Sequence, residues 1–304
     1  MSQMAGNSSV IGVYGMGVMG QSLALNIASK GMKVSVTNRS SSPKRVHETV
    51  LRAEKEGILK GNVSPHVEAA SFVKSLAQPR SIIILVPAGK AVDDVIDELL
   101  PHLASQDLLI DGGNEWYEMS IRRASQLESK GIRFIGMGIS GGEEGARNGP
   151  CMMVGGSKEA YALVSTTLDK IAARVDGEAC LALMGPVGSG NYVKMIHNGI
   201  EYAVMAVISE AYLILKHLGG LSNEQLSNVF TEWNKTELAS FLVEITAEIL
   251  KKPDDETLSG FLLDKISDKA GSNGTGKWSV QQVFTLYPCS LISIFDTLHV
   301  LNYF

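Results

Sequence analysis

Short apolar runs alternate with amphipathic segments through the first 180 residues of the chain. The runs are rich in β-branched residues and predict buried strands at Val10–Tyr14, Lys33–Thr37, Ser81–Val86, Asp107–Ile110 and Ile132–Ile135. Helical spacing of apolar residues predicts helices at Met19–Ser29, Pro43–Glu56, Ala91–Leu100 and Tyr117–Ser129. Continuous apolar strands that alternate with helices indicate a doubly wound α/β domain, with a parallel sheet covered on both faces, over residues 1–180.

The pattern changes after Gly185 and Pro186. Apolar residues at helical spacing predict helices at Tyr192–Leu218, Asn223–Phe230, Thr236–Leu250 and Leu258–Lys269. We therefore expect a partial all-α domain over residues 181–282. The end of the chain, residues 283–304, is apolar and aromatic but follows neither period. Because Pro288, Asp296 and His299 interrupt it, we interpret it as an atypical tail with no place in the fold rather than as a membrane anchor.

Composition narrows the class of protein. The chain has 304 residues, 45% apolar content and a net charge of −5, so it predicts a sizeable core and no nucleic-acid partner. Cys151, Cys180 and Cys289 lie far apart in the sequence without a CxxC pair, so we expect reduced thiols and no metal site. The segment Met1–Ser9 resembles neither a signal peptide nor a transit peptide, and we expect a cytoplasmic location without a membrane partner.

A glycine-rich turn follows the first predicted strand and opens the first predicted helix. Its residues are Gly15, Met16, Gly17, Val18, Met19 and Gly20, which fit the G-x-G-x-x-G pattern. The first glycine permits the tight turn, the second lets a pyrophosphate approach the backbone, and the third lets helix and strand pack closely. This context predicts a Rossmann-like domain that binds a dinucleotide at the helix N-terminus.

The end of the second strand indicates which dinucleotide binds. NAD enzymes usually carry Asp or Glu there, whereas this chain has Asn38, Arg39 and Ser40. Arg39 can pair with a 2′-phosphate that a carboxylate would repel, and its neighbours can add hydrogen bonds. We therefore predict NADP as the cofactor.

Five polar residues follow one another at helical spacing after residue 193. Its members at i, i+3, i+4, i+7 and i+8 are Lys194, His197, Asn198, Glu201 and Tyr202. At about 100° per residue they fall within an arc of roughly 140°. Five polar groups on one face of an otherwise apolar helix are costly to bury unless they serve a site. The alternative is a solvated stripe with a Lys–Glu pair.

Two glycine-containing segments end predicted strands at the sheet edge where open α/β proteins bind ligands. Asp111-Gly112-Gly113-Asn114 follows the fourth strand, and Ser140-Gly141-Gly142 follows the fifth. The glycine pair after Ser140 can expose backbone N–H groups to a carboxylate, although either segment alone could be an ordinary turn.

Six segments together resemble the 6-phosphogluconate dehydrogenase family: GMGVMG, DGGNEWY, GISGGEEGARNGP, YVKMIHNGIEYAVM, EWNKTELASFL and GTGKW. The resemblance spans roughly residues 8–282. It implies an NADP-dependent homodimeric enzyme of the pentose phosphate pathway. Such an enzyme oxidises 6-phospho-D-gluconate at C3 and then releases CO2 to give D-ribulose 5-phosphate.

The resemblance also implies roles for individual residues. Lys194 looks like the general base that takes the C3 hydroxyl proton, and Glu201 looks like the acid that protonates C1 of the enediol. The residues that resemble substrate ligands are Asn114, Ser140, Gly141, Gly142, His197, Asn198 and Tyr202. Besides the glycine turn and Asn38–Ser40, the residues that resemble cofactor contacts are Val86, Pro87, Ala88 and Asn114.

The chain departs from the family pattern at three places. Asn273 stands where the family commonly has a phosphate-binding Lys, and Pro87 stands where it has another Lys, with Lys90 three residues further on. After Gln282 the resemblance is expected to stop, which would leave out an Arg, and an Arg and a His from the partner subunit, that bind the substrate phosphate. We therefore expect cofactor binding to survive better than turnover, and we leave dimerisation of this chain open.

Two other functions compete with this hypothesis. One is a truncated, weakly active or inactive isoform that binds NADP or full-length subunits. The other is a related β-hydroxyacid dehydrogenase acting on a small acid such as 3-hydroxyisobutyrate. Arg39 and the runs HNGIEY and EWNKTEL favour the sugar-phosphate enzyme over the latter.

Overall fold

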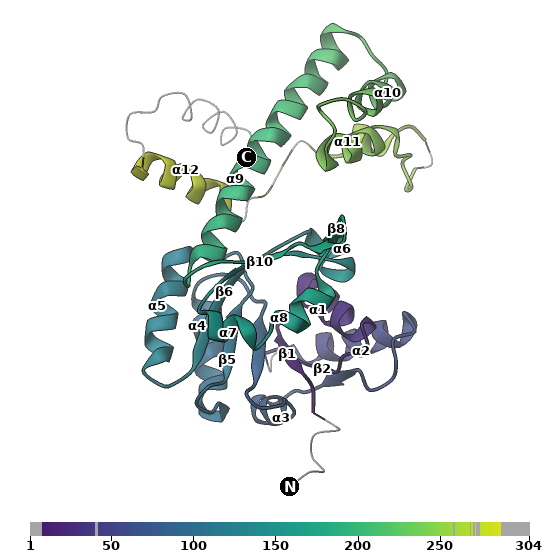
Figure 1. Ribbon diagram of the computed structural model, residues 1–304. Helices are drawn as coiled ribbons and strands as arrows, with labels where there is room; N and C mark the ends of the chain where they lie inside the picture. Colours follow the sequence, from purple (N-terminus) through teal and green to yellow (C-terminus); the bar gives the residue numbers. More distant parts are fainter. Residues whose placement is uncertain are drawn as a thin grey trace. The chain divides into compact units, whose positions relative to one another are not determined.

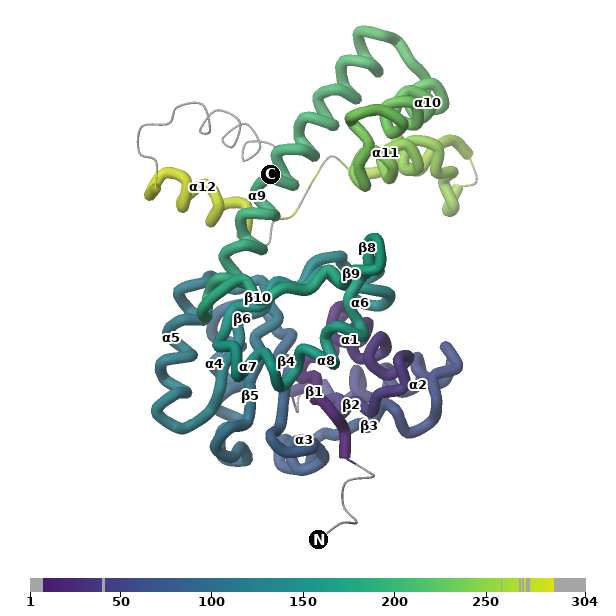
Figure 2. Tube along the Cα trace, in the orientation of Figure 1, coloured from purple at the N-terminus to yellow at the C-terminus, as the bar shows by residue number. Residues whose placement is uncertain are grey.

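The chain divides into two compact units between Met195 and Ile196. The computed structural model describes residues 8–39, 42–257, 259–267, 269, 271 and 274–286 (Figure 1). Figure 2 follows the same trace through both units. The sheet of the first unit continues past residue 180, where the sequence predicted the domain boundary, because its last strand ends at Gly185.

An eight-stranded sheet forms the centre of the first unit, in the order β10-β7-β6-β5-β4-β1-β2-β3. All neighbouring strands pair in parallel except β6 and β7, which are antiparallel. The strands are β1 (Ile11–Tyr14), β2 (Val34–Thr37), β3 (Val63–Pro65), β4 (Ser81–Ile84), β5 (Leu108–Asp111), β6 (Arg133–Ser140), β7 (Cys151–Gly155) and β10 (Leu181–Gly185). A separate hairpin joins β8 (Arg174–Val175) to β9 (Glu178–Ala179).

Helices cover both faces of this sheet, as the sequence predicts for a doubly wound domain. They are α1 (Val18–Ser29), α2 (Lys44–Lys55), α3 (Ala69–Lys74), α4 (Lys90–Leu99), α5 (Tyr117–Glu128), α6 (Gly142–Asn148), α7 (Lys158–Ala162) and α8 (Ser165–Ile171). A 3-10 turn, Leu100–His102, follows α4. The five predicted strands and four predicted helices are confirmed to within a few residues, apart from the longer β6. The strands β3, β7 and β10 and the short hairpin were not predicted.

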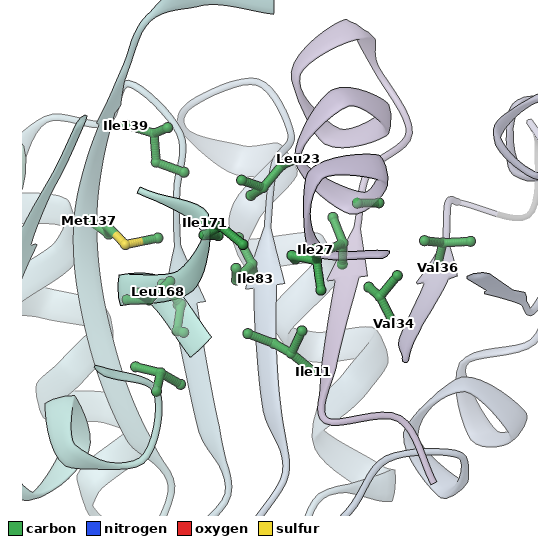
Figure 3. Packing of buried hydrophobic residues seen from close by; sticks show 14 of the residues in the cluster. Ile11, Leu23, Ile27, Val34, Val36, Ile83, Met137, Ile139, Leu168 and Ile171 are labelled. Atoms are coloured by element: carbon green, nitrogen blue, oxygen red, sulfur yellow. The ribbon is translucent and has the colours of Figure 1, made fainter. Parts of the chain in front are cut away.

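The two apolar layers follow from the alternation of side chains along each strand. Ile83 joins the core shared with α1, α2 and α8, whereas Ile82 and Ile84 join the core shared with α3, α4 and α5. Figure 3 shows the first of these layers, in which Leu23 and Ile27 of α1 point toward the sheet. A strand buried on both faces needs a continuous apolar run, which is why these strands were recognisable in the sequence.

Helix α9 (Ser189–Leu213) begins in the first unit and continues into the second, ending in a π-helical turn, Ile214–Leu218. The other helices of the second unit are α10 (Asn223–Trp233), α11 (Phe241–Lys251), a 3-10 turn (Leu262–Lys265) and α12 (Thr275–Leu286). Its core lies between α10 and α11 and contains Leu226, Phe230, Val243, Ala247 and Leu250.

Three predictions about the second unit were inaccurate. The helix expected from Thr236 begins at Phe241, because Ser240 has extended backbone and its hydroxyl caps the N–H of Val243. The helix expected over Leu258–Lys269 is wrong, since the described residues of this range form only a 3-10 turn, after Gly260 with φ of 79°. The predicted tail begins as helix, because α12 continues to Leu286, and residues 287–304 lie outside the described residues.

Candidate active site

A cavity of about 480 Å³ opens at the carboxyl ends of β1, β2 and β4. Strand β1 pairs with β2 on one side and β4 on the other, so this is the point where the strand order reverses and where open α/β sheets bind ligands. The lining residues come from the ends of these three strands and from α2 and α4. They are Tyr14, Gly15, Gly17, Asn38, Arg39, Ser42, Arg45, Leu85, Val86, Pro87, Ala91, Asp94, Val95 and Glu98.

The three glycines of the turn after β1 have different reasons to be glycine. Gly15 has φ of 106°, and a Cβ there would lie 2.3 Å from the carbonyl oxygen of Leu85. A Cβ on Gly20 would lie 1.8 Å from the carbonyl oxygen of Gly15, so this glycine lets α1 approach the turn. A Cβ on Gly17 would meet nothing within 4 Å, although Gly17 lines the cavity. Packing within the chain explains Gly15 and Gly20, and the open space at Gly17 is suited to a ligand.

Other residues of the predicted glycine loop do not line this cavity. Met16 is buried in the core and Val18 is exposed. The predicted cofactor contacts absent from the cavity lining are Met16, Val18, Met19, Gly20, Ala88 and Asn114. Gly15, Gly17, Asn38, Arg39, Val86 and Pro87 do line it, as predicted, and Ser40 lies outside the described residues.

Two arginines line the end of the cavity formed by β2 and α2. Arg39 follows β2, and Arg45 lies in the first turn of α2; both residues are exposed. The Asn38 amide donates to the carbonyl oxygen of Ser42 at 3.2 Å, which holds the connection between strand and helix. Arg45 was not among the residues predicted from the sequence. Its position six residues after Arg39, at the start of a predicted helix, was the available signal.

A buried tyrosine closes the side of the cavity next to α4. The Tyr14 hydroxyl donates to the Glu98 carboxylate at 2.7 Å. Burial and this carboxylate raise the pKa of Tyr14 well above its ordinary value, while Arg39 opposes the shift. Lys90, the only lysine near the predicted Val86–Ala88 contact in the sequence, is highly exposed and pairs with Asp94.

Lys194 lies at the end of β6, next to the predicted Ser140-Gly141-Gly142 segment. Its side chain is buried, and its Nζ donates to Oγ of Ser140 at 2.9 Å. Helix α9 can approach β6 here because of the glycines in the strand. A Cβ on Gly138 would lie 2.4 Å from Cβ of Lys194, and one on Gly136 would lie 2.1 Å from Oδ1 of Asn191. The structure therefore brings Lys194 and Ser140 together.

The remaining predicted substrate ligands of the first unit lie at the start of α6 and in the loop after β5. Gly141 is the N-cap of α6 with φ of 124°, and Gly142 follows with φ of 59°. These left-handed conformations explain why both positions are glycine. Asn114 is half-buried in the loop between β5 and α5.

The four predicted polar residues of α9 that lie in the second unit do not share one environment. His197 Nδ1 lies 3.8 Å from Glu201 Oε2, and both side chains are at least one-third exposed. Asn198 is buried, and its amide donates to the Thr275 hydroxyl of α12 at 3.0 Å. Tyr202 lies close to Gly276, where a Cβ would be 2.8 Å from its ring. Asn198 and Tyr202 therefore contact α12, whereas His197 and Glu201 contact each other.

Models of one family match both units. The model described as the NAD binding domain of 6-phosphogluconate dehydrogenase matches residues 10–185. The model of the 6-phosphogluconate dehydrogenase C-terminal domain matches residues 190–294. The second match continues past Gln282, where the resemblance was expected to stop.

Individual relatives agree with these matches. The chain is 54% identical to the chloroplastic decarboxylating 6-phosphogluconate dehydrogenase 1 of Arabidopsis thaliana over 278 residues, which are 91% of this chain and 56% of the relative. The chain thus spans about half the length of the curated relatives it matches. A structure of Plasmodium falciparum 6-phosphogluconate dehydrogenase superposes with a TM-score of 0.87 at 44% identity and covers 96% of this chain and 61% of that protein.

A more distant structure shares the fold alone. The 3-hydroxyisobutyrate dehydrogenase of Salmonella typhimurium superposes with a TM-score of 0.69 at 17% identity, covering 96% of this chain and 91% of that chain. The family is therefore decided by the two domain matches, which together extend from residue 10 to residue 294. The chain belongs to the 6-phosphogluconate dehydrogenase family.

Proposed function

We propose that the first unit binds NADP in the cavity at the ends of β1, β2 and β4. The open space at Gly17 fits a pyrophosphate next to the N-terminus of α1, and Arg39 and Arg45 supply two cations for a 2′-phosphate. The cavity lining that joins Gly17 to these two arginines is the observation that carries the proposal. The relative from Plasmodium falciparum was solved in complex with NADP+, which supports it.

We also propose that the chain contributes to the oxidative decarboxylation of 6-phospho-D-gluconate to D-ribulose 5-phosphate and CO2. When bound, NADP would accept a hydride from C3 of the sugar acid. The neutral amine of Lys194 would take the proton from the C3 hydroxyl, and the resulting ammonium would stabilise the enolate oxygen that forms as CO2 leaves. The Ser140 hydroxyl, which already accepts a hydrogen bond from Lys194, would hold this amine at the end of β6.

The second unit would complete the reaction. Glu201 lies seven residues after Lys194 on α9, and its half-exposed carboxyl group would protonate C1 of the enediol. In this unit His197, Asn198 and Tyr202 are the proposed ligands of the sugar phosphate, and in the first unit the proposed ligands are Asn114 and the Ser140–Gly142 turn. In the structure Asn198 bonds to Thr275, so substrate would share or displace that bond.

Cofactor binding and turnover can be tested separately on the purified chain. Calorimetry should detect NADP binding that is at least tenfold tighter than NAD binding. The Arg39→Ala variant should lose roughly tenfold to a hundredfold in NADP affinity, because each charged hydrogen bond is worth ~1.5–3 kcal/mol. Lys44→Ala is the matched control, since Lys44 is an exposed cation at the start of α2 that does not line the cavity. Equal affinities for NADP and NAD would contradict the proposed cofactor.

Turnover is measured as 6-phosphogluconate-dependent reduction of NADP. Lys194→Met should abolish turnover while NADP affinity stays within about twofold, since Lys194 lies outside the cavity that receives the nucleotide. If the unmodified chain binds NADP tightly but gives no turnover under any condition, the proposed reaction is wrong for this chain and the cofactor proposal stands.

A further inference from the structure

A buried arginine next to the proposed cofactor cavity has no part in the steps above. Arg123 of α5 is only 1% exposed. Its Nε donates to Asp93 at 2.8 Å, its Nη1 to Glu115 at 2.6 Å and to Asp111 at 3.2 Å, and its Nη2 to the carbonyl oxygen of Gly89 at 2.9 Å. One guanidinium group thus joins α4, α5 and the loops that follow β4 and β5.

The same acidic side chains hold the backbone of these loops. The Glu115 carboxylate accepts from the N–H of Gly89 at 2.8 Å and from the N–H of Trp116 at 2.9 Å. The Asp111 carboxylate accepts from the N–H of Gly113 at 3.0 Å. The loops also touch, because a Cβ on Gly113 would lie 3.2 Å from the carbonyl oxygen of Val86. The two loops therefore form one hydrogen-bonded assembly with Arg123 at its centre.

Stability alone is a poor reason for this arrangement. Taking several charges out of water costs free energy that their mutual attraction often fails to recover, and apolar replacements of buried ion pairs are often as stable. Here burial raises the pKa of Asp111 to about 7, which is a sign of that cost. Hydrogen bonds from charged groups are directional, whereas apolar contacts are not. Each hydrogen bond therefore fixes the position of a particular backbone atom.

The backbone that is fixed lies at the end of the cavity opposite the two arginines. Val86 and Pro87 line the cavity, and only Ala88 separates them from Gly89. In the sheet, β4 and β5 lie between β1, where the pyrophosphate would bind, and β6, where Lys194 bonds to Ser140. With its 2′-phosphate beyond β2, a dinucleotide has to extend its other half over the loops after β4 and β5.

We propose that Arg123 is a positioning residue that holds the loops after β4 and β5 in the conformation that receives the nicotinamide half of NADP. This inference rests on the proposed cofactor function. Arg123 acts through Gly89, Asp111 and Glu115 and has no direct contact with the reacting atoms. Its loss should weaken binding of the whole dinucleotide and leave binding of the adenosine half unchanged.

The test compares two ligands on four proteins. NADP contacts both halves of the cavity, whereas adenosine 2′,5′-bisphosphate lacks the nicotinamide half. The Arg123→Met variant should bind NADP 10-fold to 50-fold more weakly than the unmodified chain and bind the bisphosphate within twofold. Arg122→Met is the matched control, because Arg122 is exposed and its two hydrogen bonds go to Asp93 of α4, and both of its affinities should stay within twofold.

A second substitution keeps the test decisive if Arg123→Met does not fold. Glu115→Gln retains the size of the side chain and removes the charge that pairs with Arg123, and it should weaken NADP binding about fivefold without changing bisphosphate binding. The inference is overturned if folded variants lose both ligands equally, or if Arg122→Met loses as much NADP affinity as Arg123→Met. If the unmodified chain fails to bind the bisphosphate, the proposed cofactor function itself is at fault.

Discussion

The two units of this chain bury their apolar residues to very different degrees. In the first unit, two apolar layers cover both faces of the sheet, and core residues such as Leu23 and Ile83 are fully buried. In the second unit, the core is the small cluster between α10 and α11. The stretch Ser189–Leu218 begins in the first unit and lies mostly in the second. An 18-residue window of it has a mean hydropathy of 1.2 and only 6% of that window is buried, so length and composition alone would suit a membrane span.

This difference in burial determines whether a polar residue in an apolar helix is good evidence for a functional site. Lys194, in the first unit, is buried, so the cost of burying a polar group is a sound reason to expect a site there. His197 and Glu201, in the second unit, are partly exposed and pair with each other, so the same reasoning does not apply to them. Their proposed roles therefore depend on the family alone.

The largest effect is expected from substituting glycines of the turn after β1, where one glycine is needed for packing and another for ligand binding. Gly20→Ala places a Cβ against the backbone oxygen of Gly15, which cannot move without breaking the turn, so we expect the first unit to lose more than about 3 kcal/mol or fail to fold. Gly17→Ala meets nothing and has an ordinary φ of −73°, so stability should change by less than about 0.5 kcal/mol. Thermal unfolding of both variants measures the change in stability, and NADP titration measures the change in affinity.

The contrast between these glycines is the sensitive part of that experiment. Gly17→Ala should remain folded yet bind NADP at least tenfold more weakly, because its methyl group would occupy the space proposed for the pyrophosphate. Unchanged NADP affinity in a folded Gly17→Ala protein would mean that the phosphates do not pass this glycine.

The next effect tests whether the two units are energetically independent. Phe230 is fully buried and packs edge-on against Trp233, with ring centroids 5.0 Å apart. Phe230→Ala should cost the second unit about 3–5 kcal/mol, since it leaves a cavity in a core of few residues. Trp233 fluorescence should report early unfolding of the second unit, while NADP affinity stays within twofold. A tenfold loss of NADP affinity would show that the first unit needs the second in order to bind.

The predictable parts of the fold share one physical feature. Strands such as Ser81–Ile84 are buried on both faces and so appear as continuous apolar runs. By contrast, β3 has three residues and ends in Pro65, and β7 is rich in methionine, so neither carried a strand signal. The helix wrongly expected over Leu258–Lys269 had the right spacing, but residue 260 adopts a left-handed conformation that ends helices.

The site was predictable only where its residues belong to a recognisable motif. Gly17, Arg39 and Lys194 stand in such motifs. Arg45 and Arg123 do not, and each reads as an ordinary surface charge on an amphipathic helix. Arg45 reaches the cavity because of where α2 begins, and Arg123 is buried because α5 packs against the loops of neighbouring strands, which are facts of tertiary structure.

The smallest expected effect is a difference between the two units in how their stability depends on pH. In the first unit burial holds the pKa of Asp111 at about 7, so the folded state keeps a proton that the unfolded state releases near pH 4. Stability of this unit should therefore fall by roughly 1–4 kcal/mol as pH rises from 4 to 7. In the second unit hydrogen bonds from Thr257 and Glu256 lower the pKa of Asp254, so its contribution is present above pH 4 and is lost as pH falls further.

Unfolding followed through Trp116 in the first unit and Trp233 in the second would resolve the two pH dependences. Asp111→Asn keeps the acceptor for the N–H of Gly113 but faces Arg123 with an amide, so it should lower stability overall while flattening the fall between pH 4 and 7. Asp254→Asn should leave that fall intact and change only the acid limb of the second unit. If Asp111→Asn retains the full slope of the unmodified chain, the proton lies elsewhere in the cluster, and Glu115 and Asp93, which share Arg123, are the groups to substitute next.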